Sequence, residues 1–186
     1  TVGTGGFSTK NTSVGAFHSS YITLVIGIFM MLSGINFSLY YELYKKRFRH
    51  ILQNIELRAY LSIILVSTIL IAINIYSLYG SVFESFKHAF FQVSSIITTT
   101  GYSSVNYDLW PSFSKAILFF LMFVGGSAGS TGGAIKVIRI VILFMFVRRE
   151  IKKLLHPRAL IPIQLNQKML SGDVVAGVTG FFFLYM

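Results

Sequence analysis

Three long uncharged runs constrain this chain more than any other feature of its sequence. They cover Tyr21 to Tyr41, Ala59 to Phe83 and Ala116 to Ile135. A helix needs about 20 predominantly apolar residues to cross the hydrocarbon core of a bilayer, and each run has that length. With 54% hydrophobic and only 12% charged residues, the composition does not fit a soluble domain. The sequence therefore predicts an all-α integral membrane protein.

The positive charges predict how the spans are oriented. The formal net charge of +10 would suggest nucleic-acid binding in a soluble protein. Here the cations gather in two short stretches, namely Lys45, Lys46, Arg47, Arg49 and Arg58, and Arg148, Arg149, Lys152, Lys153 and Arg158. Short loops rich in Lys and Arg remain on the cytoplasmic side. We expect a multi-pass protein of the cell inner (plasma) membrane and no nucleic-acid partner.

The segments follow one another in a definite order. Residues 1–20 are rich in Gly, Ser and Thr and are predicted to form an outward-facing loop. Tyr21 to about Tyr44 is the first predicted span, and Glu56 to about Tyr79 is the span that returns outward. The apolar stretch from Glu84 to Thr98 is too short to cross and suits a re-entrant half-helix.

A glycine-rich stretch, Gly125-Gly126-Ser127-Ala128-Gly129-Ser130-Thr131-Gly132-Gly133, lies inside a long apolar element. An unbroken α-helix from Ser114 to Arg149 would be roughly 54 Å long, against about 30 Å for the hydrocarbon core. Each glycine weakens a helix by roughly 1 kcal/mol relative to Ala, so we expect the helix to break. Irregular backbone at membrane depth must be buried in protein or line a watery cavity, which makes this stretch a candidate gate loop. The alternative is close helix packing, because Gly125, Gly129 and Gly133 have the small-xxx-small spacing.

A short motif occurs twice. Thr4-Gly5-Gly6-Phe7-Ser8-Thr9 lines up with Thr99-Thr100-Gly101-Tyr102-Ser103-Ser104. The repeat unit is then a span, a re-entrant half-helix, a Thr/Gly turn and a second span. This unit predicts the end of one repeat in 1–55, a complete repeat in 56–150, a cytoplasmic linker in 151–171 and the start of the next repeat in 172–186. The chain is therefore expected to be an interior piece of a longer membrane protein.

The two Thr/Gly turns offer backbone carbonyls and hydroxyl groups and almost no titratable side chain. Ring carbonyl oxygens can replace the hydration shell of a monovalent cation, whereas divalent cations usually require carboxylates. Glycine adopts positive φ readily, which helps to aim carbonyls at an axis. We predict a K⁺ site formed by the filter backbone of Thr4, Gly5, Gly6, Thr99, Thr100 and Gly101. The alternative is a pair of ordinary outward loops, in which these residue types are common.

Other polar residues admit two interpretations each. Lys136 and Arg139 follow the glycine-rich stretch and are either gate-proximal charges or side chains that snorkel to the inner interface. Asn36 and Asn74 lie inside predicted spans, where hydrogen bonds between helices explain them better than ion contact does. The four histidines have no metal-ligand spacing and receive no role: His18, His50, His88 and His156.

No arrangement of residues predicts an enzyme. The glycine-rich stretch lacks the Gly-Lys-Ser/Thr ending of a phosphate-binding loop, because Lys136 lies between Ile135 and Val137. The six acidic residues form no pair suited to acid–base catalysis, and there is no cysteine. We expect neither catalytic residues nor a cofactor in this chain.

These motifs resemble those of the Trk/Ktr potassium transporter family, in its TrkH/KtrB-type membrane subunits. The resemblance rests on residues 4–9, on 99–102, on Gly-Gly-Ser-Ala-Gly-Ser-Thr-Gly-Gly-Ala-Ile-Lys-Val-Ile-Arg at 125–139 and on 156–159 in the linker. It implies four membrane helix–pore loop–membrane helix repeats around one pore, related to the potassium channel pore. Gly6 and Gly101 would be the filter glycines of the second and third repeats, and 125–133 the intramembrane gate. Departures are Tyr102, where Phe is commoner, and Ala134, where a third Gly is frequent.

The resemblance also implies partners. It suggests a homodimer and a cytoplasmic regulatory subunit of the TrkA/KtrA type, which alone would bind nucleotide. The filters of the first and fourth repeats, and a basic residue near the gate in the fourth, lie outside this sequence. We expect potassium uptake through a carbonyl-lined filter gated by the glycine-rich loop. Two alternatives remain: a secondary carrier with discontinuous helices that moves a small solute by alternating access, and a membrane scaffold without transport.

Overall fold

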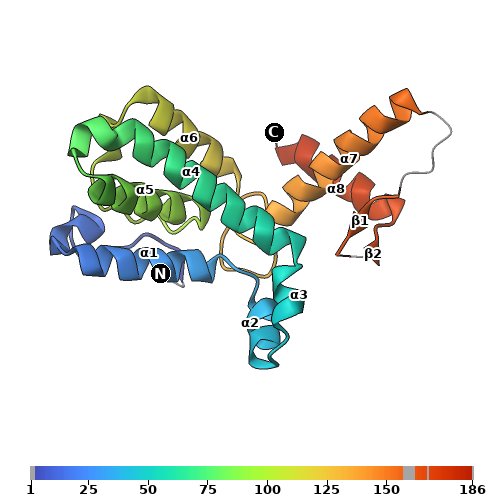
Figure 1. Ribbon diagram of the computed structural model, residues 1–186, viewed down its shortest axis with the longest axis horizontal. Helices are drawn as coiled ribbons and strands as arrows, with labels where there is room; N and C mark the ends of the chain where they lie inside the picture. Colours follow the sequence, from blue (N-terminus) through green and yellow to red (C-terminus); the bar gives the residue numbers. More distant parts are fainter. Residues whose placement is uncertain (1–2, 157–161, 167, 186) are drawn as a thin grey trace.

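The computed structural model describes residues 3–156, 162–166 and 168–185, and helices predominate in them (Figure 1). The prediction of a helical protein is therefore confirmed. The α-helices are α1 (Ser20–Ser33), α2 (Phe37–Tyr44), α3 (Phe48–Leu52), α4 (Ile55–Tyr79), α5 (Val82–Ile97), α6 (Ser112–Phe123), α7 (Val137–Leu155) and α8 (Gly172–Tyr185). Two 3₁₀ helices and one antiparallel pair of strands complete the described elements: η1 (Ser13–Phe17), η2 (Tyr107–Leu109), β1 (Gln164–Leu165) and β2 (Lys168–Met169).

The longest apolar helix is α4, and it confirms the helix predicted over 56–79. It begins where the Asn54 side chain accepts a hydrogen bond from the Leu57 N–H, and it ends at Gly80, whose φ is +63°. Among the described residues, α4 is the one single helix that is long and apolar enough to cross a membrane. The bent pair α1 and α2 meets the same criterion when taken together.

The short helix α5 lies at the centre of the helical stack. Figure 1 shows it between α1 on one side and α4 and α6 on the other, and it packs against all three. The buried apolar side chains of α4, α5 and α6 form one core: Tyr60, Ile64, Ile71 and Ile75 from α4, Ala89, Val93 and Ile97 from α5, and Leu118 and Leu121 from α6. The core therefore fixes α5, and with it the Thr/Gly turn that follows α5.

The prediction of one continuous span from Tyr21 to Tyr44 is wrong. α1 ends at Ser33, and α2 starts at Phe37 after a bend of 94°. The Asn36 side chain accepts a hydrogen bond from the Ser38 N–H at 2.9 Å and so begins a new helix. Gly34 in the break is packed so tightly that a Cβ there would lie 2.2 Å from Tyr60 Oη.

The C-terminal part forms a separate small cluster. α7 packs on α8, with Ile142, Ile163 and Val175 buried between them and the hairpin. Thus the stretch predicted as a linker contains the end of α7 and the β1–β2 hairpin. Residues 157–161, which include Arg158 of the second cationic stretch, lie outside the described residues.

We predict that Gly34→Ala destabilises the full-length protein by about 1–3 kcal/mol, because the added methyl group overpacks the contact with Tyr60. Thermal unfolding in detergent measures the effect as a lower Tm. Gly177→Ala is the control, since a Cβ on Gly177 in α8 meets no atom within 4 Å. It should stabilise α8 by about 0.5–1 kcal/mol. An unchanged Tm for Gly34→Ala would contradict the tight packing of the break.

Candidate functional site

The two Thr/Gly turns lie side by side. A Cβ on Gly6 would be 2.8 Å from the Thr100 carbonyl oxygen, and one on Gly101 would be 3.6 Å from the Gly6 Cα. The loops that follow are joined as well, because the N–H groups of Val14 and Gly15 donate to the Ser103 carbonyl at 3.1 and 3.3 Å. The fold thus brings together the two copies of the repeated motif.

The matched positions of the two turns share one backbone pattern. φ is +42° at Thr4 and +65° at Gly6, and it is +55° at Thr99 and +83° at Gly101. The residues between them do not have positive φ. Positive φ is a genuine outlier for a β-branched residue and costs of order 1–3 kcal/mol. The surrounding structure must therefore hold both threonines in place.

The end of α5 holds the second turn. The Ser95 carbonyl accepts from the Thr100 N–H at 2.9 Å and from the Gly101 N–H at 3.3 Å, and the Ser95 hydroxyl donates to the Tyr102 carbonyl at 2.6 Å. The Thr98 hydroxyl donates to the Ser94 carbonyl at 2.6 Å. The Thr100 hydroxyl, 2.8 Å from that of Thr98, must then donate to it. Both threonine side chains are buried, so their hydroxyls serve the fold.

The glycine-rich stretch lies directly against both turns. Residues 124–136 form no helix and connect α6 to α7; Figure 1 shows this loop beside the end of α1. The Thr4 hydroxyl donates to the Thr131 carbonyl at 3.3 Å, and the Gly133 N–H donates to the Thr99 hydroxyl at 2.8 Å. The three motifs that the sequence singled out are therefore neighbours in space.

The loop is closed by its own hydrogen bonds. The Gly125 N–H donates to the Ile135 carbonyl at 2.8 Å, and the Val137 N–H donates to the Gly126 carbonyl at 3.2 Å. Because this backbone is not helical, the small-xxx-small interpretation of Gly125, Gly129 and Gly133 as a helix-packing stripe does not apply.

The loop also fills the break between α1 and α2. The Ser127 N–H donates to the Gly34 carbonyl at 2.9 Å, and the Phe37 N–H donates to the Gly129 carbonyl at 3.2 Å. The backbone groups of the α1–α2 break that lack helical partners thus bond to backbone groups of the loop, and the loop's groups bond to the break in return. Sequence analysis did not foresee this pairing, since it placed no break near Gly34.

Lys136 and Arg139 have different surroundings. The Lys136 ammonium turns back to the loop and donates to the carbonyls of Ser130, at 3.4 Å, and Gly132. The Arg139 guanidinium lies 3.9 Å from the ring centroid of Phe181 in α8. Lys136 is therefore the cation that touches the loop.

The two asparagines of the predicted spans both make polar contacts between segments. The Ser114 hydroxyl of α6 donates to Asn74 Oδ1 of α4 at 2.7 Å, as expected for a hydrogen bond between helices. Asn36 instead begins α2 and lies next to the loop, because a Cβ on Gly129 would be 3.1 Å from Asn36 Oδ1.

Sequence analysis missed Glu56. Its side chain is buried at the start of α4, and its Oε1 accepts a hydrogen bond from the Ala128 N–H of the loop at 2.5 Å. Sequence analysis gave it no role, since an acid in the first turn of a helix is common. The signal available was one carboxylate three residues before the uncharged run that starts at Ala59.

A polar cluster lies at the other end of α5. The Lys87 ammonium donates to the hydroxyl of Ser20 at 2.9 Å and to the carboxylate of Glu84. His88 Nδ1 lies 3.0 Å from the hydroxyl of Ser104, which follows the second turn. The Lys87 ammonium holds the pKa of the Glu84 carboxyl below its usual value, and burial lowers the pKa of His88. This cluster fastens α5 to α1 and to the loop beyond the turn.

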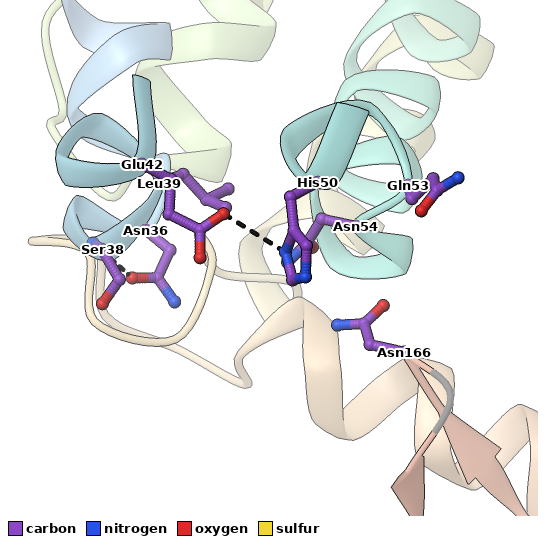
Figure 2. Close-up of a pocket in the computed structure, with 8 residues that line it drawn as sticks. All are labelled: Asn36, Ser38, Leu39, Glu42, His50, Gln53, Asn54 and Asn166. Carbon is purple, nitrogen blue, oxygen red and sulfur yellow. Dashed lines mark hydrogen bonds and ion pairs between the residues drawn. The ribbon is translucent and has the colours of Figure 1, made fainter. Parts of the chain in front are cut away.

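Two cavities flank the site. One of about 600 Å³ lies beyond the turns, between the 11–18 and 103–108 loops. The other, of about 200 Å³, lies among α2, α3, the start of α4 and Asn166 (Figure 2). There His50 Nδ1 lies 3.3 Å from Glu42 Oε2, and Asn36 lines the same cavity. The described residues contain no cluster of three or more His, Cys, Asp or Glu side chains that could hold a metal.

Comparison with known proteins gives consistent matches. The family described as "TrkH: Cation transport protein" matches residues 1–186. The Trk system potassium uptake protein TrkH of Salmonella typhimurium is 37% identical over 188 residues, covering 100% of this chain and 39% of the relative. TrkG of Escherichia coli is 39% identical over 191 residues, with 100% of this chain and 39% of the relative covered.

The fold has a solved counterpart. The crystal structure of the potassium transporter TrkH from Vibrio parahaemolyticus matches with a TM-score of 0.91 and 36% identity, covering 99% of this chain and 40% of that one. The chain thus spans about two fifths of the length of these relatives. A family match over its whole length shows that the chain belongs to the TrkH family of cation transport proteins.

Proposed function

We propose that this chain forms part of the potassium pathway of a Trk-type uptake protein in the cell inner membrane. One observation carries the proposal: the two matched turns lie side by side with the same alternation of φ, and the glycine-rich loop is hydrogen-bonded to both. The relatives are named as potassium uptake proteins, which supports K⁺ as the transported ion. K⁺ is then the substrate, and no cofactor is needed in this chain.

The chemistry of the turns supports a filter for a monovalent cation. Alternating positive and negative φ rotates successive peptide planes so that their carbonyls face one side of the chain. The hydroxyls of Thr4, Thr99 and Thr100 each make hydrogen bonds within the fold, which favours backbone carbonyls as the ligands. The segments Thr4 to Gly6 and Thr99 to Gly101 contain no carboxylate. Carbonyls without carboxylates suit K⁺ better than a divalent cation.

The order of elements supports a repeated pore unit. We propose that 1–55 ends one repeat and that 56–150 is a complete one, in which α4 is the first membrane helix and α5 the pore half-helix. α6 and α7 are then two halves of one broken membrane helix. Residues 151–171 form a cytoplasmic connection, and 172–186 begin the next repeat.

The glycine-rich loop, Gly125 to Gly133, is proposed as the gate. Its bonds to Thr4 and Thr99 are few, and a typical hydrogen bond contributes only about 1 kcal/mol net. Moving the loop away from the turns therefore costs little enough for a regulator to shift the open population. Lys136 restrains the loop by binding its carbonyls.

Exposed cations near α2 and α3 suggest where a cytoplasmic partner could bind. The residues between α2 and α4 include Lys45, Lys46, Arg47 and Arg49, all exposed, and Figure 1 shows α2 and α3 projecting from the helical stack. We propose that this projection helps to dock a TrkA/KtrA-like nucleotide-binding subunit. A homodimer is proposed on the family resemblance alone.

We predict that Gly101→Ser in the full-length protein lowers the preference for K⁺ or Rb⁺ over Na⁺ by about tenfold, because a side chain at φ +83° distorts the carbonyls of the turn. Flux into proteoliposomes measures it. Gly80→Ser is the matched control, since Gly80 also has positive φ but ends α4 away from the turns. It should leave selectivity unchanged. A Gly101→Ser protein that conducts with unchanged selectivity would contradict the filter, and flux of an organic solute would favour a carrier.

We also predict that Lys136→Met raises basal Rb⁺ flux about tenfold while selectivity stays constant, because the loop loses a charged donor to its carbonyls. The same proteoliposome assay, without a regulatory subunit, measures it. Lys115→Met removes an exposed lysine whose ammonium donates to the Asp108 carbonyl, outside the loop, and it should behave as wild type. Equal basal flux in the Lys136→Met and wild-type proteins would show that Lys136 does not restrain the gate.

A further inference from the structure

We propose that Glu56 is the positioning residue that holds the glycine-rich loop closed, by joining it to the α1–α2 break and to the start of α7. The inference rests on the proposed role of Gly125 to Gly133 as the gate. It proposes that a residue of α4, outside the loop, holds the gate closed through a hydrogen bond to Ala128.

The carboxylate of Glu56 is placed to bind the middle of the loop. The residue is only 5% exposed, and its Oε1 accepts from the Ala128 N–H at 2.5 Å. Ala128 lies near the middle of the loop, so this bond holds a part of the loop that is far from its junctions with α6 and α7. α4 is a long, well-packed helix, which gives the carboxylate a fixed base.

Two further segments meet the same carboxylate. The side chain of Asn36, in the α1–α2 break, and the backbone of Ile138, in the first turn of α7, lie close enough to Glu56 to stabilise its negative charge. Asn36 Oδ1 already accepts from the Ser38 N–H, so its amide NH₂ is the group that can donate to Glu56. The N-terminus of α7 carries partial positive charge, which favours a carboxylate there.

Charge adds to this arrangement. The Lys136 ammonium attracts the Glu56 carboxylate, while its own donors hold the carbonyls of Ser130 and Gly132. Glu56 therefore holds an N–H of the loop, and Lys136 holds carbonyls of the same loop. Hydrogen bonds to an ionised group are about twice as strong as neutral ones, so the Glu56 carboxylate is a strong anchor for the Ala128 N–H.

The alternative is that Glu56 serves only the first turn of α4. Asn54 already begins that helix by accepting from the Leu57 N–H at 3.0 Å. A helix-start role needs no contact with Ala128, Asn36 or Ile138, and it predicts a change in stability without a change in loop movement. The two roles therefore differ in a measurable way.

The test uses the full-length protein carrying Ser127→Cys, with any cysteines elsewhere replaced. Ser127 is fully buried in the loop, and the 186 residues of this chain contain no cysteine. The rate of modification by a charged thiol reagent then reports loop opening without reference to transport. Rb⁺ and Na⁺ flux is measured in parallel on proteins without Ser127→Cys.

We expect Glu56→Gln to raise both the modification rate and the basal Rb⁺ flux about tenfold with unchanged selectivity, as for the loss of one charge-assisted hydrogen bond. Glu56→Asp keeps the charge but shortens the reach, and it should give a smaller increase. Glu150→Gln is the control, because the ion pairs of Glu150 within the described residues are with Arg149 and Lys153 on α7. It should match wild type in both assays.

If Glu56→Gln folds and both its modification rate and its basal Rb⁺ flux match wild type, the inference is overturned. If Glu56→Gln does not fold, an unchanged modification rate in Glu56→Asp overturns it instead. A lower Tm alone, with no change in modification, would indicate the helix-start role. If wild type carries no K⁺-selective flux but Glu56→Gln still speeds modification, the proposed function fails and the anchor stands. If wild type is K⁺-selective and Glu56→Gln changes neither rate, the anchor fails alone.

Discussion

Satisfying the backbone of residues 124–136 is the constraint on which the rest of this structure depends. In the proposed placement of this segment at membrane depth, each of its N–H and carbonyl groups needs a partner in the protein or in a water-filled cavity. The loop pairs with itself between Gly125 and Ile135, and with the α1–α2 break at Gly34. It also bonds the Thr99 hydroxyl, and the Glu56 carboxylate takes its central N–H. The α1–α2 break, the second turn and the start of α4 therefore each supply a hydrogen-bond partner to the loop.

The two broken segments depend on each other. If α1 and α2 were one straight helix, the Gly34 carbonyl would bond within that helix and the Ser127 N–H would lose its partner. The α1–α2 break in turn needs the Phe37 N–H to reach the Gly129 carbonyl. Such mutual bonds hold the loop in place, yet each contributes only about 1 kcal/mol. That balance suits a segment that must be ordered at rest and still able to move.

The local part of this fold could be predicted from the sequence. The existence of α4 follows from the long uncharged run of Ala59 to Phe83, and its end follows from Gly80. Non-helical backbone over 124–136 follows from the glycine content of that stretch. The α1–α2 break could not be predicted, because one glycine costs a helix only about 1 kcal/mol and the deciding contact with Tyr60 is distant in sequence. Asn36 was assigned to a hydrogen bond between helices, but it starts α2. The contact of Glu56 with the loop could not be predicted for the same reason, since its hydrogen-bond partner Ala128 is 72 positions away in the sequence.

The central claim is that the carbonyls of the paired turns bind potassium. The most direct measurement is a structure of the full-length protein with Tl⁺ or Rb⁺ in place of K⁺, in which anomalous scattering locates the ion. The account predicts an ion in coordination contact with carbonyl oxygens of Thr4 to Gly6 and of Thr99 to Gly101. Ion density found elsewhere in the protein, with none at these turns, would contradict it.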